Sequence, residues 1–228
     1  MVKKANIIDI IRVNDKIENF TTKFGGQPDW ICEPQWPMSS SWDNRPMMFL
    51  CQIVVDENLF ASNTKKMAYI FITHGEKPYD DFFDPDIIFA DGGENAIIIQ
   101  PDGEIVPDLQ IKNMVTGPTI FDDTGVSFEG YPNLEISSDP AFINENDYKK
   151  LSEYDQNIYF EKTDGNKIGG VPCFFEGDQF PDSDVDWKLL LQLNSNFLPF
   201  YLNLGASPTI FAFVSEDLKH GRLLIQGS

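Results

Sequence analysis

Acidic side chains at alternate positions form the set in this sequence that most resembles a group of metal ligands. Asp182, Asp184 and Asp186 are separated by single residues, as at the start of a calcium-binding loop. Such a loop also needs a glycine at its sixth position for a sharp turn and a glutamate at its twelfth as a bidentate ligand. Counted from Asp182, those positions hold Trp187 and Leu193. The spacing therefore predicts a solvated acidic loop without a metal ion.

Other catalytic chemistry finds little support in the residue types. Structural zinc needs four cysteine or histidine ligands at recognisable spacing, and this chain has three cysteines and two histidines, all scattered singly. His74 and His220 each precede a glycine after an apolar run, a placement typical of exposed loop residues. No nucleophile elbow, phosphate-binding loop or dinucleotide fingerprint occurs. We therefore expect a protein without catalytic residues, metal or cofactor.

The charge of the chain restricts its partners. With 36 acidic and 17 basic residues the formal charge is −19. Nucleic acids bind through clustered lysine and arginine, so this excess of carboxylates predicts repulsion of both nucleic acid and anionic membranes. A basic protein would instead be attracted. The alternative is that the excess charge only maintains solubility.

Two acidic clusters and the tryptophans of a loop-like stretch are the candidate contacts for such a partner. Tryptophans on loops are enriched at binding hot spots, although filling a core is their commoner role. The candidate partner-binding residues are Asp80, Asp81, Asp84, Asp86, Asp182, Asp184, Asp186, Trp36 and Trp42.

The cysteine pattern and the start of the sequence indicate a cytoplasmic protein. Cys32, Cys51 and Cys173 are an odd number without a Cys-x-x-Cys pair, which is typical of a reducing compartment. The first apolar stretch is interrupted early by Asp9 and Arg12, unlike a secretion signal. No run of 18 apolar residues predicts a membrane span.

An internal repeat organises the elements that would position these residues. Residues 23–30 read KFGGQPDW and residues 167–174 read KIGGVPCF. In each copy a second proline, preceded by glutamine and an aromatic residue, comes nine positions after the first. An apolar run around a glutamine follows, and an aromatic strand-like run comes 19 positions after that glutamine. The matched residues are Gly25, Gly26, Pro28, Pro37 and Gln52 in one copy, and Gly169, Gly170, Pro172, Pro181 and Gln192 in the other.

Each copy reads as a glycine turn, a proline-bounded loop and two buried strands. Paired glycines suit a tight turn, proline discourages helix, and short runs of β-branched and aromatic residues favour strands. Gln52 and Gln192 interrupt apolar strands, and buried amides need partners. Either each amide binds the backbone of its own glycine turn, or the two are ligand-binding groups in a cleft between the copies.

The segment 75–160 between the copies is rich in turn residues. Residues 96–100 (AIIIQ) and 104–111 (EIVPDLQI) read as the strands of a hairpin that turns at Asp102-Gly103. Isoleucines at rough helical spacing predict a helix near the N-terminus, and Asp139-Pro140 predicts the start of a second. We expect few others.

The order and spacing of these motifs resemble the YwqG-like family of bacterial proteins, a domain of unknown function. The resemblance covers 23–72 and 167–214 and carries no known catalytic residues. It implies an α+β, β-rich fold in which two pseudo-symmetric copies of the glycine-turn unit pack into one compact domain over 1–228. We expect a non-catalytic, acidic protein-binding protein, in its sharpest form a cytoplasmic immunity protein that neutralises a basic toxin. The alternative is a small-molecule-binding protein or enzyme with its pocket between the two repeats.

Overall fold

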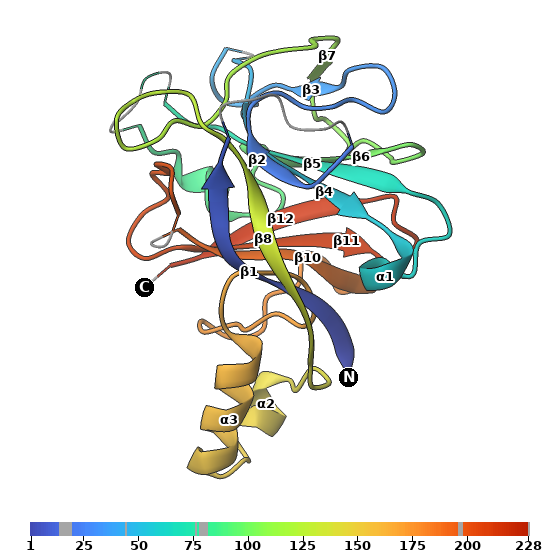
Figure 1. Ribbon diagram of the computed structural model, residues 1–228, viewed down its shortest axis with the longest axis vertical. Helices are drawn as coiled ribbons and strands as arrows, with labels where there is room; N and C mark the ends of the chain where they lie inside the picture. The colour runs from blue at the N-terminus through green and yellow to red at the C-terminus, as the bar shows by residue number, and fades with distance from the viewer. Residues whose placement is uncertain (14–19, 44, 76, 78–81, 196–197, 228) are drawn as a thin grey trace.

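The computed structural model describes residues 1–13, 20–43, 45–75, 77, 82–195 and 198–227 (Figure 1). Its strands are β1 (Val2–Arg12), β2 (Lys23–Gly25), β3 (Trp36–Pro37), β4 (Met48–Val55), β5 (Lys66–Ile72), β6 (Asn95–Gln100), β7 (Ile111–Lys112), β8 (Glu129–Asp139), β9 (Lys167–Gly169), β10 (Trp187–Asn194), β11 (Thr209–Ser215) and β12 (Gly221–Gln226). Its helices are short, namely α1 (Glu57–Phe60), the 3₁₀ helix η1 (Pro85–Ile88), α2 (Glu145–Tyr148) and α3 (Glu153–Thr163).

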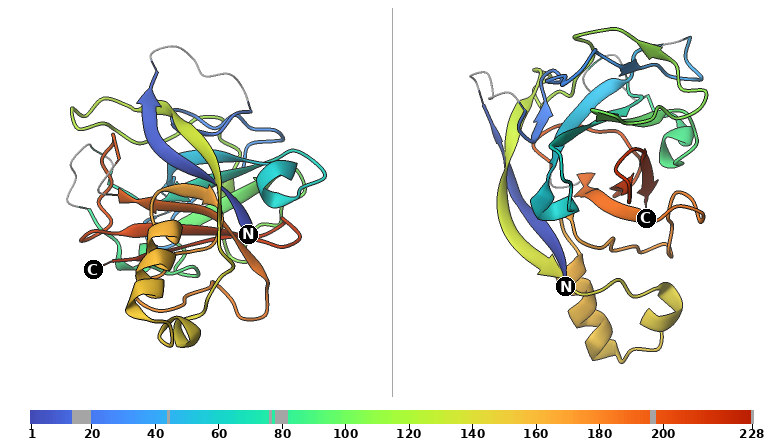
Figure 2. Two further views of the ribbon diagram at one scale, coloured as in Figure 1. Left: turned by 60° about the horizontal axis from the view of Figure 1, so that its bottom comes forward. Right: turned by 90° about the vertical axis from the view of Figure 1, so that its right-hand side faces the viewer.

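Ten of the strands form one antiparallel sheet in the order β12-β11-β10-β9-β1-β8-β2-β4-β5-β6. The long strands β1 and β8 pair in its middle, and four strands follow on each side. The sheet folds over so that β4, β5 and β6 lie above β10, β11 and β12 (Figures 1 and 2). Its two edge strands come together where Gly221 of β12 packs closely on Ile97 of β6.

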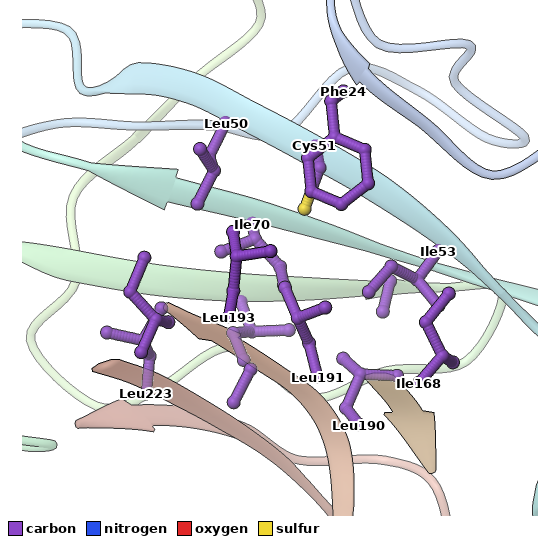
Figure 3. Packing of buried hydrophobic residues seen from close by; sticks show 14 of the residues in the cluster. Phe24, Leu50, Cys51, Ile53, Ile70, Ile168, Leu190, Leu191, Leu193 and Leu223 are labelled. Atoms are coloured by element: carbon purple, nitrogen blue, oxygen red, sulfur yellow. The ribbon is translucent and has the colours of Figure 1, made fainter. Parts of the chain in front are cut away.

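The main core fills the space between the two halves of the folded sheet. Apolar side chains from β2, β4 and β5 point toward those of β9, β10 and β12 (Figure 3). The labelled members are Phe24, Leu50, Cys51, Ile53, Ile70, Ile168, Leu190, Leu191, Leu193 and Leu223. Since side chains of neighbouring strand positions point to opposite faces, the other face of each half needs its own cover.

A second cluster covers the outer face of β4, β5 and β6. In β5, Ile70 belongs to the main core whereas Tyr69 and Phe71 pack with Trp36 on the outer face. The β3–β7 ribbon and the loops beside it lie over this cluster. Burial on both faces explains why every residue of β5 is buried and why its sequence reads as a continuous apolar run.

The expectation of an α+β fold, in which two pseudo-symmetric copies of the glycine-turn unit pack into one compact domain, is wrong. The protein is predominantly β, and a single sheet runs through both predicted copies. β1 pairs with β8 on one side and with β9 on the other, so strands from outside the predicted copies join them. The second copy also lacks a counterpart of the β3–β7 pair, because Pro37 lies in β3 whereas Pro181 lies in no described strand.

Three local predictions fail as well. The predicted N-terminal helix is strand β1, whose Ile7 and Ile10 point to the core while Ile8 is exposed. The predicted hairpin does not form, because β7 begins only at Ile111 and pairs with β3. The second predicted helix begins late, at Glu145, and the longer α3 had no prediction.

The paired glycines hold an acidic side chain against a buried lysine. Gly170 has a φ of +80°, and a Cβ there would lie 2.3 Å from Oδ2 of Asp139. That carboxylate accepts a 2.8 Å hydrogen bond from the Lys167 ammonium, and Lys4 lies 2.7 Å from its other oxygen. Burial lowers the pKa of Lys167 by desolvation, against the effect of Asp139. A side chain at position 170 would therefore displace the carboxylate from its lysines.

The first turn has the same arrangement. A Cβ at Gly26, with a φ of +67°, would meet the Glu129 carboxylate, which accepts a 2.9 Å hydrogen bond from Lys23. The backbone of each turn thus leaves room for a carboxylate of its own. In the pattern Lys-x-Gly-Gly, the lysine is placed to bind that carboxylate.

The two glutamines bind backbone groups on both sides of these turns. The side-chain oxygen of Gln52 accepts a 2.8 Å hydrogen bond from the Asp29 N–H, and its amide donates to the Thr21 carbonyl at 2.8 Å. The oxygen of Gln192 accepts a 2.9 Å bond from the Cys173 N–H, and its amide donates to the Gly165 carbonyl at 2.9 Å. These bonds occupy both side-chain amides within the fold.

Candidate functional site

A buried glutamate holds the loop that carries Trp42. The Glu94 carboxylate, which is completely buried, accepts a 2.7 Å hydrogen bond from the Ser39 hydroxyl and bonds from the N–H groups of Ser40 and Ser41 at 3.1 and 2.9 Å. The Ser39 oxygen in turn accepts from the Trp42 N–H at 3.0 Å. Such charge-assisted bonds fix the loop more firmly than neutral ones would.

The tryptophan side chain is held by a second loop. Its indole Nε1 donates a 2.6 Å hydrogen bond to Asp84, and its ring meets Phe82 edge to face at 5.0 Å. The Arg45 guanidinium lies 4.4 Å from the centre of the Phe82 ring and 5.6 Å from that of Trp42. A cation over aromatic rings is attracted by their electron-rich faces. The indole is therefore fixed in position although it remains 44% exposed.

Exposed aromatic and acidic side chains gather on these two loops. Phe83 and Phe89 are 41% and 52% exposed, and both belong to the loop around η1. The exposed carboxylates of the same loops are Asp43, Asp86 and Asp91. We call the set Trp42, Phe83, Phe89, Asp43, Asp86 and Asp91 the Trp42 surface. Fixed aromatic rings beside exposed carboxylates can bind apolar and cationic groups of a partner together.

A cavity of about 410 Å³ adjoins this surface at the seam between β6 and β12. Ser40, Asp91 and Asn95 line it from the first half of the chain, and Arg222 lines it from the second. Among the described residues no ion pair or hydrogen bond involves the Arg222 side chain, which leaves its guanidinium available to a ligand. Polar groups from both halves of the chain thus line one hollow.

The predicted partner-binding residues take different places in the structure. Asp80 and Asp81 lie outside the described residues. Asp84 is 6% exposed and caps η1 through its 2.8 Å bond from the Asp86 N–H, so it positions Trp42 and offers little surface itself. Trp36 was predicted to contact a partner, but it is completely buried and its indole N–H donates a 2.8 Å hydrogen bond to the Met47 carbonyl.

The second acidic cluster does not join the first. Asp182, Asp184 and Asp186 are exposed in the loop before β10. The following Trp187 lines a hollow together with Phe60 of α1. In Figure 1, α1 and the green segment of η1 lie on opposite sides of the molecule. The Asp184 N–H donates to Asp182 at 2.8 Å, a local turn bond. Among the described residues, Asp86 thus lies on a different surface from Asp182, Asp184 and Asp186.

The remaining reactive side chains are dispersed. Cys32 is exposed, while Cys51 and Cys173 are buried, and desolvation raises the pKa of both buried thiols. His74 is buried, contrary to the expected exposed position, and its Nε2 accepts a 3.2 Å bond from the Asn203 N–H. Among the described residues no three Asp, Glu, His or Cys side chains gather as metal ligands. Within the same residues no helix has the length and apolar character needed to cross a bilayer.

Sequence reasoning missed the residues that organise the site. Glu94 lies in an acidic and glycine-rich stretch, and nothing in its neighbours predicts complete burial. Two further glutamines, Gln100 and Gln226, fix other loops and were also missed. Both end apolar strands, much as Gln52 and Gln192 interrupt them, and that pattern could have identified them. Gln100 accepts from the Cys32 N–H at 3.0 Å, and Gln226 accepts from the Phe175 N–H at 3.1 Å.

The fold and the site define a predominantly β protein that carries a fixed aromatic and acidic surface on loops outside its sheet. The chain belongs to the family of the domain of unknown function DUF1963, whose model matches residues 22–220. A comparison with curated proteins found no match.

Proposed function

We propose that this chain is a non-catalytic binding protein whose Trp42 surface binds a basic protein. The carrying observation is that Trp42, Phe83 and Phe89 stay exposed while buried Glu94 and Asp84 fix their loops. A fixed loop loses little conformational freedom on binding, so more of the contact energy contributes to affinity. The charge of −19 adds long-range attraction for a cationic partner. In the sharpest form of the proposal the chain is a cytoplasmic bacterial immunity protein and the partner is a basic toxin.

Affinity purification from the native host, followed by mass spectrometry, tests the proposal. The full chain should retain a basic protein at low ionic strength and release it as salt screens the charges. A variant with Asp43→Asn, Asp86→Asn and Asp91→Asn should lose that protein, as should Trp42→Ala. The matched control is Asp182→Asn, Asp184→Asn and Asp186→Asn, which removes the same charge elsewhere and should retain the partner. If only the control set abolishes retention, the Trp42 surface is not the binding site.

The alternative function is small-molecule binding at the seam cavity. Its support is the convergence of Arg222, Asn95 and Ser40 on one hollow of about 410 Å³, within the size range of ligand pockets. The packed core fills the space between the half-sheets (Figure 3), so this alternative has its ligand in the seam cavity, which both halves line. Arg222→Leu should abolish thermal stabilisation by a bound metabolite without weakening retention of a protein partner, so the two functions are separable.

We also propose the narrower YwqG-like membership and an ancestral duplication. The support is that Gln52 and Gln192 accept from equivalent N–H groups, those of Asp29 and Cys173, each four residues after the first glycine of its turn. A carboxylate also packs against the second glycine of each turn, Glu129 against Gly26 and Asp139 against Gly170, which is a further equivalence. An alignment of many relatives in which both glycine turns vary together would support this, and one in which only one copy recurs would refute it.

A further inference from the structure

Six aromatic rings line a hollow of about 300 Å³ beside the helices α2 and α3. The two helices project from the body of the sheet (Figures 1 and 2). The rings are Phe142, Tyr148, Tyr159, Phe160, Phe174 and Phe175. We call this place the aromatic hollow. It shares no lining residue with the seam cavity.

The tyrosines of the aromatic hollow offer ring surfaces rather than free hydroxyl groups. The Tyr159 hydroxyl accepts a 3.1 Å hydrogen bond from the Ile143 N–H, and the Tyr148 hydroxyl donates to the Gln156 carbonyl at 3.3 Å. The two tyrosine rings lie 5.8 Å apart, inclined to each other by 57°. Because the hydroxyls already have partners, a ligand in the hollow meets mainly the rings.

The wall formed by residues 174–177 is fixed by the sheet. Gln226 of β12 accepts hydrogen bonds from the N–H groups of Phe175 and Glu176 and donates to the Gly177 carbonyl at 3.0 Å. Phe174 packs on Phe211 of β11 with ring centres 5.0 Å apart. The hollow is therefore a preformed feature of the fold.

Carboxylates border the aromatic hollow. Glu145 and Asp178 line it, and Asp178 accepts a 2.8 Å bond from the Glu145 N–H, which leaves its second oxygen for another donor. Lys149 also lines it, but its ammonium is paired with Glu145. Residues 145–178 contain eight carboxylates and four lysines, of which Lys167 is buried. The local field therefore favours cations and opposes anions.

We propose that the aromatic hollow binds an organic cation of the methylated ammonium class. Alkylammonium methyl groups are weakly hydrated and pack on aromatic faces, where the ring quadrupole attracts the positive charge. Asp178 supplies the opposite charge at the border, and the hollow is at the lower end of the size range of ligand pockets. The cation is either a free small molecule or a methylated lysine side chain. This proposal does not depend on the function proposed for the Trp42 surface.

The test compares choline with 3,3-dimethyl-1-butanol, its uncharged isostere, by calorimetric titration of the full chain. Choline should bind saturably, and the isostere at least about five-fold more weakly, because it lacks the charge–ring attraction. Equal affinities would show a merely apolar pocket and overturn the proposal. A peptide with trimethyl-lysine and its unmethylated counterpart form the second arm, which identifies the source of the cation. Absence of binding in both arms also overturns it.

Three variants locate the binding. Phe160→Ala, at a ring that is 46% exposed, should weaken choline binding about two- to thirty-fold. Asp178→Asn keeps the shape and removes the charge, so it should weaken choline but not the isostere. Tyr154→Ala is the matched control, since Tyr154 is an exposed ring of the same helix α3 that does not line the hollow. Unchanged affinity in the first two variants would place the ligand elsewhere and refute the site.

Discussion

The indole nitrogen of Trp42 lies 2.6 Å from a carboxylate oxygen of Asp84, and this bond joins two loops that are 42 positions apart in the sequence. The same carboxylate group caps η1 through the Asp86 N–H. One buried acid therefore sets both the conformation of the η1 loop and the orientation of the exposed indole. The Trp42 surface depends on a residue that a partner would scarcely touch.

Asp84→Ala should lower the free energy of unfolding by about 1–3 kcal/mol. The substitution removes a helix cap and leaves the Trp42 indole N–H without its charged hydrogen-bond acceptor. Urea unfolding followed by circular dichroism measures this. Asp86→Ala is the control, since that side chain is exposed and should change stability by less than about 0.5 kcal/mol. Equal losses in the two variants would contradict the positioning role of Asp84.

Gln52→Leu and Gln192→Leu should each lower the free energy of unfolding by about 1–3 kcal/mol, because each leaves buried backbone donors and acceptors without hydrogen-bond partners. The two losses should be similar, since the two amides make equivalent bonds. Gln179→Leu, at an exposed position, serves as the control. Were either buried glutamine replaceable without loss, its amide would be free for a ligand.

Gly170→Ala should cost about 3–5 kcal/mol, because the new methyl group would separate Asp139 from its buried lysines. Gly165 also has a positive φ, but a Cβ added there would meet open space. Gly165→Ala should therefore lower the free energy of unfolding by only about 1–2 kcal/mol. Thermal unfolding of both variants distinguishes steric displacement from backbone strain. A smaller loss at Gly170 than at Gly165 would refute the explanation of the paired glycines.

One thiol should react quickly with a disulfide reagent in the folded protein and two only on unfolding. Cys32 is exposed, whereas burial raises the pKa of Cys51 and Cys173 and keeps both protonated. Thiolate is the reactive form, so both burial and protonation slow the reaction. Thiol titration with and without denaturant measures this, and Cys32→Ala should remove the fast phase.

The buried thiols also set a pH dependence of stability. Above about pH 8.5 an unfolded thiol releases its proton while the folded protein retains it. The unfolded state then binds fewer protons, so the free energy of unfolding falls as pH rises. Cys51→Ala should make this fall shallower in urea unfolding between about pH 8 and about pH 10. Cys32→Ala should leave the slope unchanged, and a steeper slope in Cys51→Ala would contradict the argument.

The strands that could be predicted from the sequence are those whose apolar character is evident within a short stretch of residues. β4, β5, β10 and β11 are short apolar runs buried on both faces, and such runs are readable without knowledge of the tertiary structure. β1 was taken for a helix because its isoleucines occur at mixed spacing. Its extended form depends on pairing with β8 and β9, which lie far away in the sequence.

The candidate site was predicted only in part, for a similar reason. Trp42 and Asp86 were identified by residue type and do lie on exposed loops. Glu94 was missed, since its role comes from three bonds to a loop about fifty residues earlier. Trp36 looked like a loop residue, but it lies in β3 and packs against Phe71 on the outer face of β5.

The central place of β1 has a consequence for synthesis of the chain on the ribosome. β1 is bordered by Glu129–Asp139 and Lys167–Gly169, which are synthesised long after it, so its two edges stay open until both segments have emerged. Pairings this distant in sequence close slowly, and an unpaired edge is prone to aggregate in the meantime. Chaperone dependence of the nascent chain should therefore end only after β9 has left the exit tunnel.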